Sequence, residues 1–131
     1  MKITVDTNVL ARAILQDDPI QCSSARELLK SATLIAVSLP SLCELVWILR
    51  QGAKLSKEDI SVAIRALFDT ANVVMNRPAV EAGLALLEAG GDFADGIIAH
   101  EGKWLGGETF LSFDKRAVTL LSQHGESAQL L

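Results

Sequence analysis

The sequence lacks the features that mark several common classes of protein. Its 131 residues include only two cysteines, Cys22 and Cys43, and neither has a histidine or a second cysteine at the spacing of a zinc site. No apolar stretch approaches the roughly 20 residues that a membrane-spanning helix needs. Asp and Glu outnumber Lys and Arg by 16 to 12, a net charge of −4. A zinc module, a membrane protein and a protein with a broad basic nucleic-acid surface are therefore disfavoured.

The remaining composition predicts a single cytoplasmic domain over residues 1–131. Half of the residues are apolar, which is enough for a sizeable core in a chain of this length. The start of the chain, MKITVDTN, has Asp6 where a signal peptide would have its apolar run. In the reducing cytoplasm we expect both cysteines to be core thiols. The apolar surplus further predicts surfaces buried against another subunit or a partner.

Short apolar runs alternate with helical patterns along the whole chain. The runs predict strands over residues 3–5, 34–37, 73–75 and 109–113, with a further edge strand over 128–131. The helical spacing of apolar residues predicts helices over 8–15, 21–30, 41–51, 56–68, 78–89, 94–104 and 115–124. Ser56 suits a helix N-cap and Gly52 a helix end. This alternation indicates an α/β fold with a mostly parallel sheet of four to five strands, covered on both faces.

Four carboxylates fall among apolar residues. Asp6 and Asp114 each follow a predicted strand, and ligands of open parallel sheets bind outside the carboxyl ends of the strands. Glu44, in SLCELVW, and Asp95, in FADGIIA, lie in apolar helices, where charged groups are almost never buried unless they are paired or bound to metal. Each acid alone has a structural alternative as a helix cap or a solvent-facing residue. Together they suggest one acidic crevice.

Clustered carboxylates repel one another and raise some of their pKa values unless a cation neutralises them. An all-oxygen site without His or Cys favours Mg²⁺, or Mn²⁺. Such an ion lowers the pKa of an attacking water and neutralises charge on a phosphate. The pattern therefore suggests hydrolysis of a phosphodiester, which also reconciles the negative charge of the chain with an anionic substrate.

The blocks VDTNVL, SLCEL, DFADGIIA and TFLSFDKRAV, in this order, resemble the PIN-domain family and within it the VapC-type toxins. The resemblance covers nearly the whole chain. It implies an α/β/α three-layer sandwich and an acidic metal site at Asp6, Glu44, Asp95 and Asp114. It also implies that Asn8 and Ser112 support this site by hydrogen bonds. Asp92, one turn before Asp95, is either a further acid or a helix cap, and Gly96 replaces the Ala that commonly follows the third acid.

The same resemblance implies a homodimeric Mg²⁺-dependent endoribonuclease that cuts single-stranded or loop RNA, often tRNA or rRNA, and is inhibited by a cognate antitoxin. Basic side chains that could touch RNA phosphates are better explained as solvated helix surface: Arg12, Arg50, Lys115 and Arg116. His100 and His124 are expected to be exposed helix residues rather than acid catalysts. Trp47 and Trp104 are expected to serve packing or an interface.

Competing interpretations fit the residues less well. A haloacid-dehalogenase-type phosphotransferase would need a second Asp two positions after Asp6, where Asn8 stands. A receiver domain would need its acceptor Asp after a middle strand, where Ser38 and Asn76 follow instead. A dinucleotide-binding domain is disfavoured because the first strand-to-helix turn has no glycine. The main alternative is a catalytically inactive PIN-like interaction or regulatory module, against which the presence of all four acids speaks.

Overall fold

The computed structural model describes residues 1–131, and the chain divides into two compact units, Met1–Asn76 and Arg77–Leu131. We describe each unit by itself. None of the helices is long and apolar enough to cross a membrane.

The first unit is built on a small parallel sheet. Strand β1 (Lys2–Thr4) pairs with β2 (Leu34–Ala36), which pairs in turn with β3 (Val73–Val74), all in parallel. The register aligns Ile3 with Ile35, and Ile35 with Val73. Ile35 at the centre of β2 and Val73 in β3 are buried, whereas Lys2 and Thr4 of β1 are exposed.

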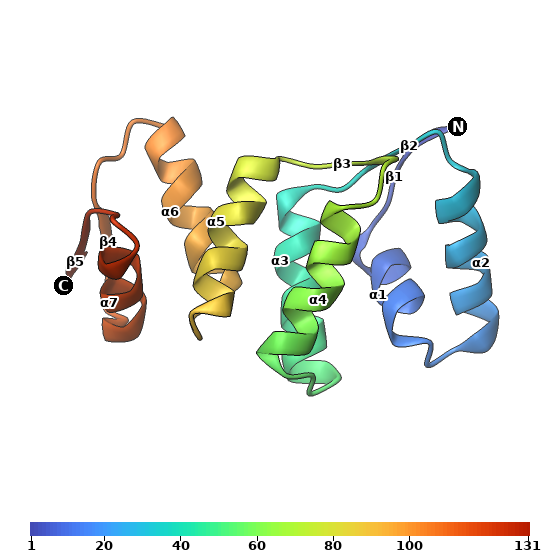
Figure 1. The fold of residues 1–131 in the computed structure, drawn as a ribbon, viewed down its shortest axis with the longest axis horizontal. Coiled ribbons are helices and arrows are strands. Elements are labelled where there is room, and N and C mark those ends of the chain that lie inside the picture. The colour runs from blue at the N-terminus through green and yellow to red at the C-terminus, as the bar shows by residue number, and fades with distance from the viewer. The chain divides into compact units, whose positions relative to one another are not determined.

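Five helical segments of the first unit connect these strands (Figure 1). They are α1 (Thr7–Leu15), α2 (Pro19–Ser31), α3 (Leu39–Trp47), the π-helical segment η1 (Ile48–Gly52) and α4 (Lys57–Phe68). Helix α1 packs against both α2 and α3. The fully buried side chains of this core are Leu10, Ile35, Leu42, Leu45, Leu49, Ile60 and Ile64.

The helix predicted over residues 41–51 is longer and less regular than expected. It starts at Leu39 and widens into η1 over its last five residues, so that Ala53 donates to the carbonyl of Ile48. Gly52 lies inside this last turn, and the left-handed residue that follows is Lys54, with φ of 60°. The helical segment ends at Gly52, as predicted. Ser56 is likewise confirmed as the N-cap of α4, because its Oγ accepts a bond from the Asp59 N–H at 3.1 Å.

The second unit consists of a pair of helices in contact, followed along the chain by a strand, a helix and a second strand. Its elements are α5 (Arg77–Glu88), α6 (Phe93–Trp104), β4 (Phe110–Ser112), α7 (Lys115–Gln123) and β5 (Ala128–Leu130). Strand β4 pairs with β5 in parallel. Leu86, Leu120 and Leu121 form a buried cluster, against which Phe110 and Ala128 pack.

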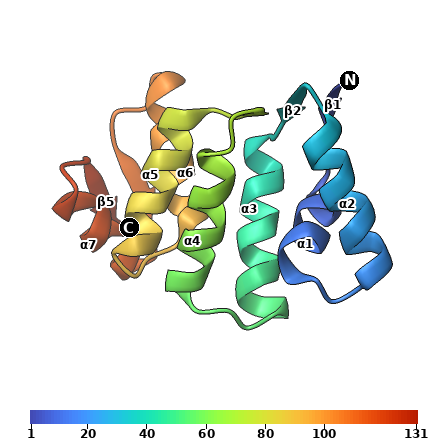
Figure 2. The ribbon, with the colours of Figure 1, turned by 45° about the vertical axis from the view of Figure 1, so that its right-hand side comes forward.

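Helices α5 and α6 form the most extensive contact between elements of the chain and run side by side (Figure 2). Two glycines permit this approach. A Cβ at Gly96 would overlap the carbonyl oxygen of Ala82 and would lie 2.8 Å from the Cα of Gly83. A Cβ at Gly83 would lie 2.9 Å from ring atoms of Phe93. The departure from Ala at position 96 is thus explained by the close packing of the two helices.

The predicted fold class is confirmed, since seven α-helices accompany strands that pair only in parallel. All five strands were expected, including the short one at the C-terminal end. The strands are hydrogen-bonded as a set of three in the first unit and a set of two in the second. Hydrophobic runs predict where strands occur, but they contain no information on which strand edges are hydrogen-bonded.

Candidate active site: the acidic residues

Asp6 stands at the junction of β1 and α1. The strand ends at Thr4, and the Asp6 side chain caps α1 by accepting a hydrogen bond from the Val9 N–H at 3.1 Å. The N-terminal end of a helix favours a nearby negative charge, and the cap fixes the position of this side chain. The side chain is exposed, and it remains available to a ligand from solvent.

The next residue, Thr7, links α1 to Glu44 on α3. Thr7 is 7% exposed, and its Oγ1 donates a hydrogen bond of 2.8 Å to Oε2 of Glu44. This contact joins residues 37 positions apart in the sequence and restrains the carboxylate of Glu44. Sequence reasoning missed the role of Thr7. The only signal was its position within the DTN block, directly after the first acid.

The expectation that Glu44 lies among apolar side chains was wrong, because the residue is exposed. Leu42, Leu45 and Leu49 form the buried stripe of this helical segment and are fully buried. Glu44 falls outside that stripe, and Trp47 lies outside it as well, at 66% exposed. Neighbours in sequence point in different directions on a helix, so apolar flanks do not show that a residue is buried.

In the second unit, the charges of two acidic residues, Asp92 and Asp114, act on a third, Asp95. Asp92 is the N-cap of α6 and accepts a bond from the Ala94 N–H at 2.8 Å, which confirms the cap that the sequence left open. Asp95 follows in the first turn of the same helix and is half-buried. Asp114 caps α7 by accepting bonds from the N–H groups of Arg116 and Ala117, at 3.0 and 3.2 Å.

Asp95 has the most perturbed environment of the four predicted acids. Burial of its carboxyl is the largest cause of a pKa raised above the ordinary value for Asp, and the negative charges of Asp92 and Asp114 raise the pKa further. Unlike the three capping acids, Asp95 accepts no backbone hydrogen bond at a helix end that would favour its ionised form. It is therefore the residue whose charge has most to gain from a cation.

Ser112 and Asn8 were predicted to support the acids. The Oγ of Ser112 accepts a hydrogen bond from the Asp114 N–H at 2.9 Å, which fixes the backbone of that acid at the end of β4. Asn8 is exposed and, together with Asp6, lines a groove on the first unit. Their contribution to activity stays a prediction.

The other residues noted in the sequence differ in their exposure. Trp104 is 80% exposed, and its indole N–H donates to Nε2 of His100 at 3.2 Å. His124 is exposed as expected, whereas His100 is half-buried. Cys22 is confirmed as a buried thiol, but Cys43 is only partly buried. Neither tryptophan belongs to the core.

The donors of this site are carboxylate oxygens, which are the ligands that Mg²⁺ and Mn²⁺ prefer. No group of three or more His, Cys, Asp or Glu side chains is arranged around a common cation position in the structure. Mg²⁺ keeps several waters and usually takes only one or two carboxylates directly. The chemistry of the acids and the like-charge environment of Asp95 therefore fit a hydrated divalent cation.

Comparison with known proteins identifies the family. The model of the PIN domain matches residues 3–120, which is most of the chain and includes all four predicted acids. The chain therefore belongs to the PIN domain family, whose members are generally nucleases that use divalent metal ions. No curated protein matches the chain. The match crosses both compact units, and the organisation as one domain stays a prediction.

Proposed function

We propose that the protein is a Mg²⁺-dependent endoribonuclease of the VapC type, the toxin of a type II toxin–antitoxin pair, acting in the cytoplasm. The family match supports nuclease activity of some kind. The four sequence blocks that resemble VapC-type toxins support RNA as the substrate and a cognate antitoxin as the inhibitor. Structured RNAs with single-stranded loops, such as tRNA or rRNA, are the proposed targets.

The observation that carries this proposal is the environment of Asp95. A half-buried carboxyl group whose pKa is raised by the charges of two further acids is an unfavourable arrangement for a protein that has no cation to bind. Titratable groups with perturbed pKa values are concentrated at functional sites. The cost of keeping Asp95 ionised is explained if the site is built for a positively charged ligand.

In this proposal Asp6, Glu44, Asp95 and Asp114 hold the cation directly or through its waters, and Asn8 and Ser112 keep the acids in position. A bound divalent cation would help a water to lose its proton and would neutralise charge on the phosphate under attack. The chain itself contributes the orientation of the acids. Thr7 restrains Glu44, and the helix ends fix Asp6 and Asp114 through backbone N–H groups.

A homodimer and an antitoxin complex are proposed as the assembly states. The support is the resemblance to VapC-type toxins together with two large exposed side chains, Trp47 at 66% and Trp104 at 80%. Tryptophans are enriched at protein interfaces.

The direct test is cleavage of RNA by the purified protein in Mg²⁺, compared with the same reaction in EDTA. Asp95→Asn should abolish cleavage, whereas Glu101→Gln, which removes a charge from an exposed residue of the same helix, should cleave as the unsubstituted protein does. Calorimetric titration with Mn²⁺ should show that the unsubstituted protein binds the ion. Asp95→Asn should weaken this binding, and Glu101→Gln should leave it unchanged. No cleavage by a folded protein that binds RNA or an antitoxin would favour the inactive-module alternative. Cleavage that persists in EDTA would refute the dependence on a divalent cation.

A further inference from the structure

A groove with a volume of about 340 Å³ lies between α1 and α2 of the first unit. One wall comes from the start of α1 and the other from one face of α2, where the lining residues recur at helical spacing. Val9, Ala25 and Leu28 provide apolar surface within it. The volume is near the lower end of the range of about 300–1,000 Å³ that small-molecule sites occupy. The groove therefore suits one small ligand group rather than a folded partner.

Polar side chains project from both walls. Asn8 comes from α1, and Gln21 and Ser24 come from α2. An amide offers a donor and an acceptor side by side, which is the pattern that pairs with the edge of a nucleobase, and a hydroxyl can adapt to either role. Apolar surface between such groups is what the faces of a planar base require.

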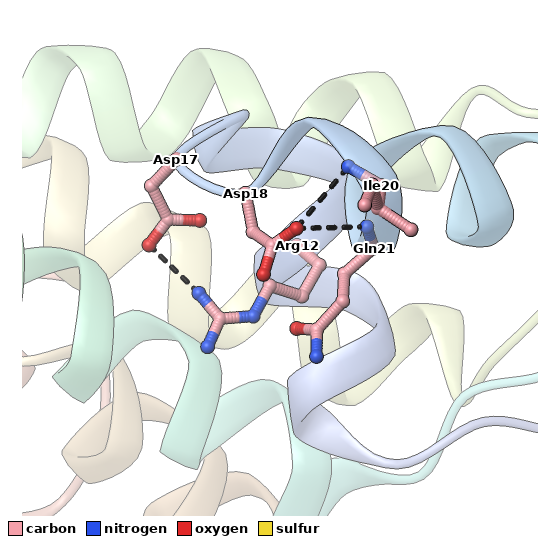
Figure 3. A network of polar contacts seen from close by, with 5 residues as sticks. All are labelled: Arg12, Asp17, Asp18, Ile20 and Gln21. Carbon is pink, nitrogen blue, oxygen red and sulfur yellow. Dashed lines mark hydrogen bonds and ion pairs between the residues drawn. The ribbon is translucent and has the colours of Figure 1, made fainter.

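The Gln21 side chain is not used to hold the end of its own helix. Asp18 caps α2 by accepting bonds from the backbone N–H groups of Ile20 and Gln21, at 3.1 and 3.0 Å. Figure 3 shows the Gln21 amide extending away from this cap. The first turn of α2 is thus fixed by Asp18, while the amide of Gln21 stays available.

Arg12 provides a fixed positive charge at the same groove. Its Nη1 donates a bond of 2.7 Å to Asp17 (Figure 3), and this bond is the main cause that holds the pKa of Asp17 below its ordinary value. Asp17 therefore stays ionised at neutral pH and keeps the guanidinium in place. A guanidinium has five N–H donors, so donors beyond the one used on Asp17 can meet an acceptor of the ligand.

Asp6 lines the groove and is also one of the four predicted acids. We propose that the groove binds one unpaired base of a single-stranded RNA, close to the phosphate on which the acidic residues act. The proposal rests on the proposed nuclease function and adds a specificity subsite to it. A base is favoured over a protein segment because the groove is small and combines amide, hydroxyl and guanidinium groups with apolar surface.

Binding can be measured without cleavage in a protein that has the Asp95→Asn substitution, which lies outside the groove. The probe is a labelled single-stranded oligoribonucleotide, together with versions that each have one abasic position. Fluorescence anisotropy should show one position at which loss of the base weakens binding by about five- to tenfold, the contribution expected of one bound base.

Two neighbouring serines of α2 give a matched pair of variants. Ser24→Leu fills the groove and should weaken binding of intact RNA to the level of the abasic version. Ser23→Leu changes an equally exposed serine that does not line the groove, and its binding should be unchanged. Gln21→Ala removes the amide without adding bulk and should reduce the base dependence in the same direction, so the conclusion does not depend on the folding of one variant.

The possible failures can be told apart. Equal RNA binding by Ser24→Leu and Ser23→Leu, or no position that depends on its base, would overturn the subsite. So would a change of oligomeric state in Ser24→Leu with unchanged RNA binding, because the groove would then be a protein interface. Cleavage by the protein with Asp95 intact reports separately on the proposed function. RNA that is bound in this base-dependent way but never cut would refute the nuclease and leave the subsite standing.

Discussion

Helix α6 contains two glycines whose replacement by alanine should have opposite effects on stability. Gly96 lies against α5, where a Cβ would overlap the carbonyl oxygen of Ala82 and approach the Cα of Gly83 to 2.8 Å. Gly102 lies in the same helix, and a Cβ built there has no atom within 4 Å. The same chemical change is therefore made in a tight contact and in open space.

The magnitudes follow from this difference. Alanine in place of glycine stabilises a helix interior by about 0.5–1 kcal/mol, and Gly102→Ala should show this gain in full. Overpacking costs typically about 1–3 kcal/mol, and the contact at Gly96 is with backbone atoms that cannot rotate away. Taking the upper value and subtracting the helix gain, Gly96→Ala should lose about 2 kcal/mol.

Thermal and urea denaturation of the two variants and the unsubstituted protein measure the effect. In a chain of this length about 1 kcal/mol shifts the melting temperature by roughly 4 °C. Gly96→Ala should therefore melt about 8 °C lower, and Gly102→Ala about 2–4 °C higher. If Gly96→Ala were as stable as the unsubstituted protein or more so, the close approach of α5 and α6 would be refuted. A destabilised Gly102→Ala would refute the claim that this position is open.

Substitutions at three positions, Thr7, Asp95 and Asp6, test the acidic residues further. Thr7→Val should lower RNA cleavage but should cost at most about 1 kcal/mol of stability, because the exposed Glu44 carboxylate regains hydration. Thr7→Ser keeps the hydroxyl and should cleave RNA normally. Unchanged cleavage by Thr7→Val would count against the restraint of Glu44 by Thr7. The folded state binds the Asp95 proton more tightly than the unfolded chain does, so the stability of the metal-free protein should fall as pH rises from the ordinary pKa of Asp through the raised one. Asp95→Asn should remove that decline and raise the melting temperature at neutral pH in EDTA, and a pH profile that is the same with and without the substitution would contradict this. Asp6→Asn should abolish RNA cleavage at nearly unchanged stability, because Asn also caps helices. Asp6→Ala should abolish cleavage and should also lower the stability by about 0.5–2 kcal/mol. Equal melting curves for the two variants would exclude the cap as a source of stability.

Much of the fold was predictable because each element has a local signal. The helix that Ser56 caps begins and ends within one residue of its predicted bounds, and α6 runs from Phe93 to Trp104 where residues 94–104 were expected. Capping residues and apolar periodicity act over a few residues and are visible in sequence. The pairing of strands depends on contacts between distant segments, so the division into a set of three and a set of two strands could not be predicted in this way.

The candidate site was predictable in its residue types and less so in their surroundings. The position of Asp6 and Asp114 just after strands was expected and is confirmed. The exposure of Glu44 and its bond to Thr7 were not, because the partner lies 37 residues away. The role of Gly96 was also missed, since its reason is the backbone of Ala82 on another helix. Tertiary contacts of this kind leave no periodic trace in the sequence.

The capping role of an acid and a role in metal binding were treated as alternatives in the sequence, but the hydrogen bonds show that they are compatible. The caps at Asp6, Asp92 and Asp114 all use one carboxylate oxygen, Oδ1, including both bonds at Asp114. The second oxygen of each side chain is not needed by the helix end. A helix N-terminus also lowers the cost of the negative charge and limits the motion of the side chain. The fold can therefore orient Asp6 and Asp114 without a cation, whereas Asp95, which has no such backbone partner, has a pKa raised by burial and by the charges of Asp92 and Asp114. Substitution of Asp95 should therefore raise the stability of the metal-free protein while it abolishes cleavage. Substitution of a capping acid should not show this opposition as clearly.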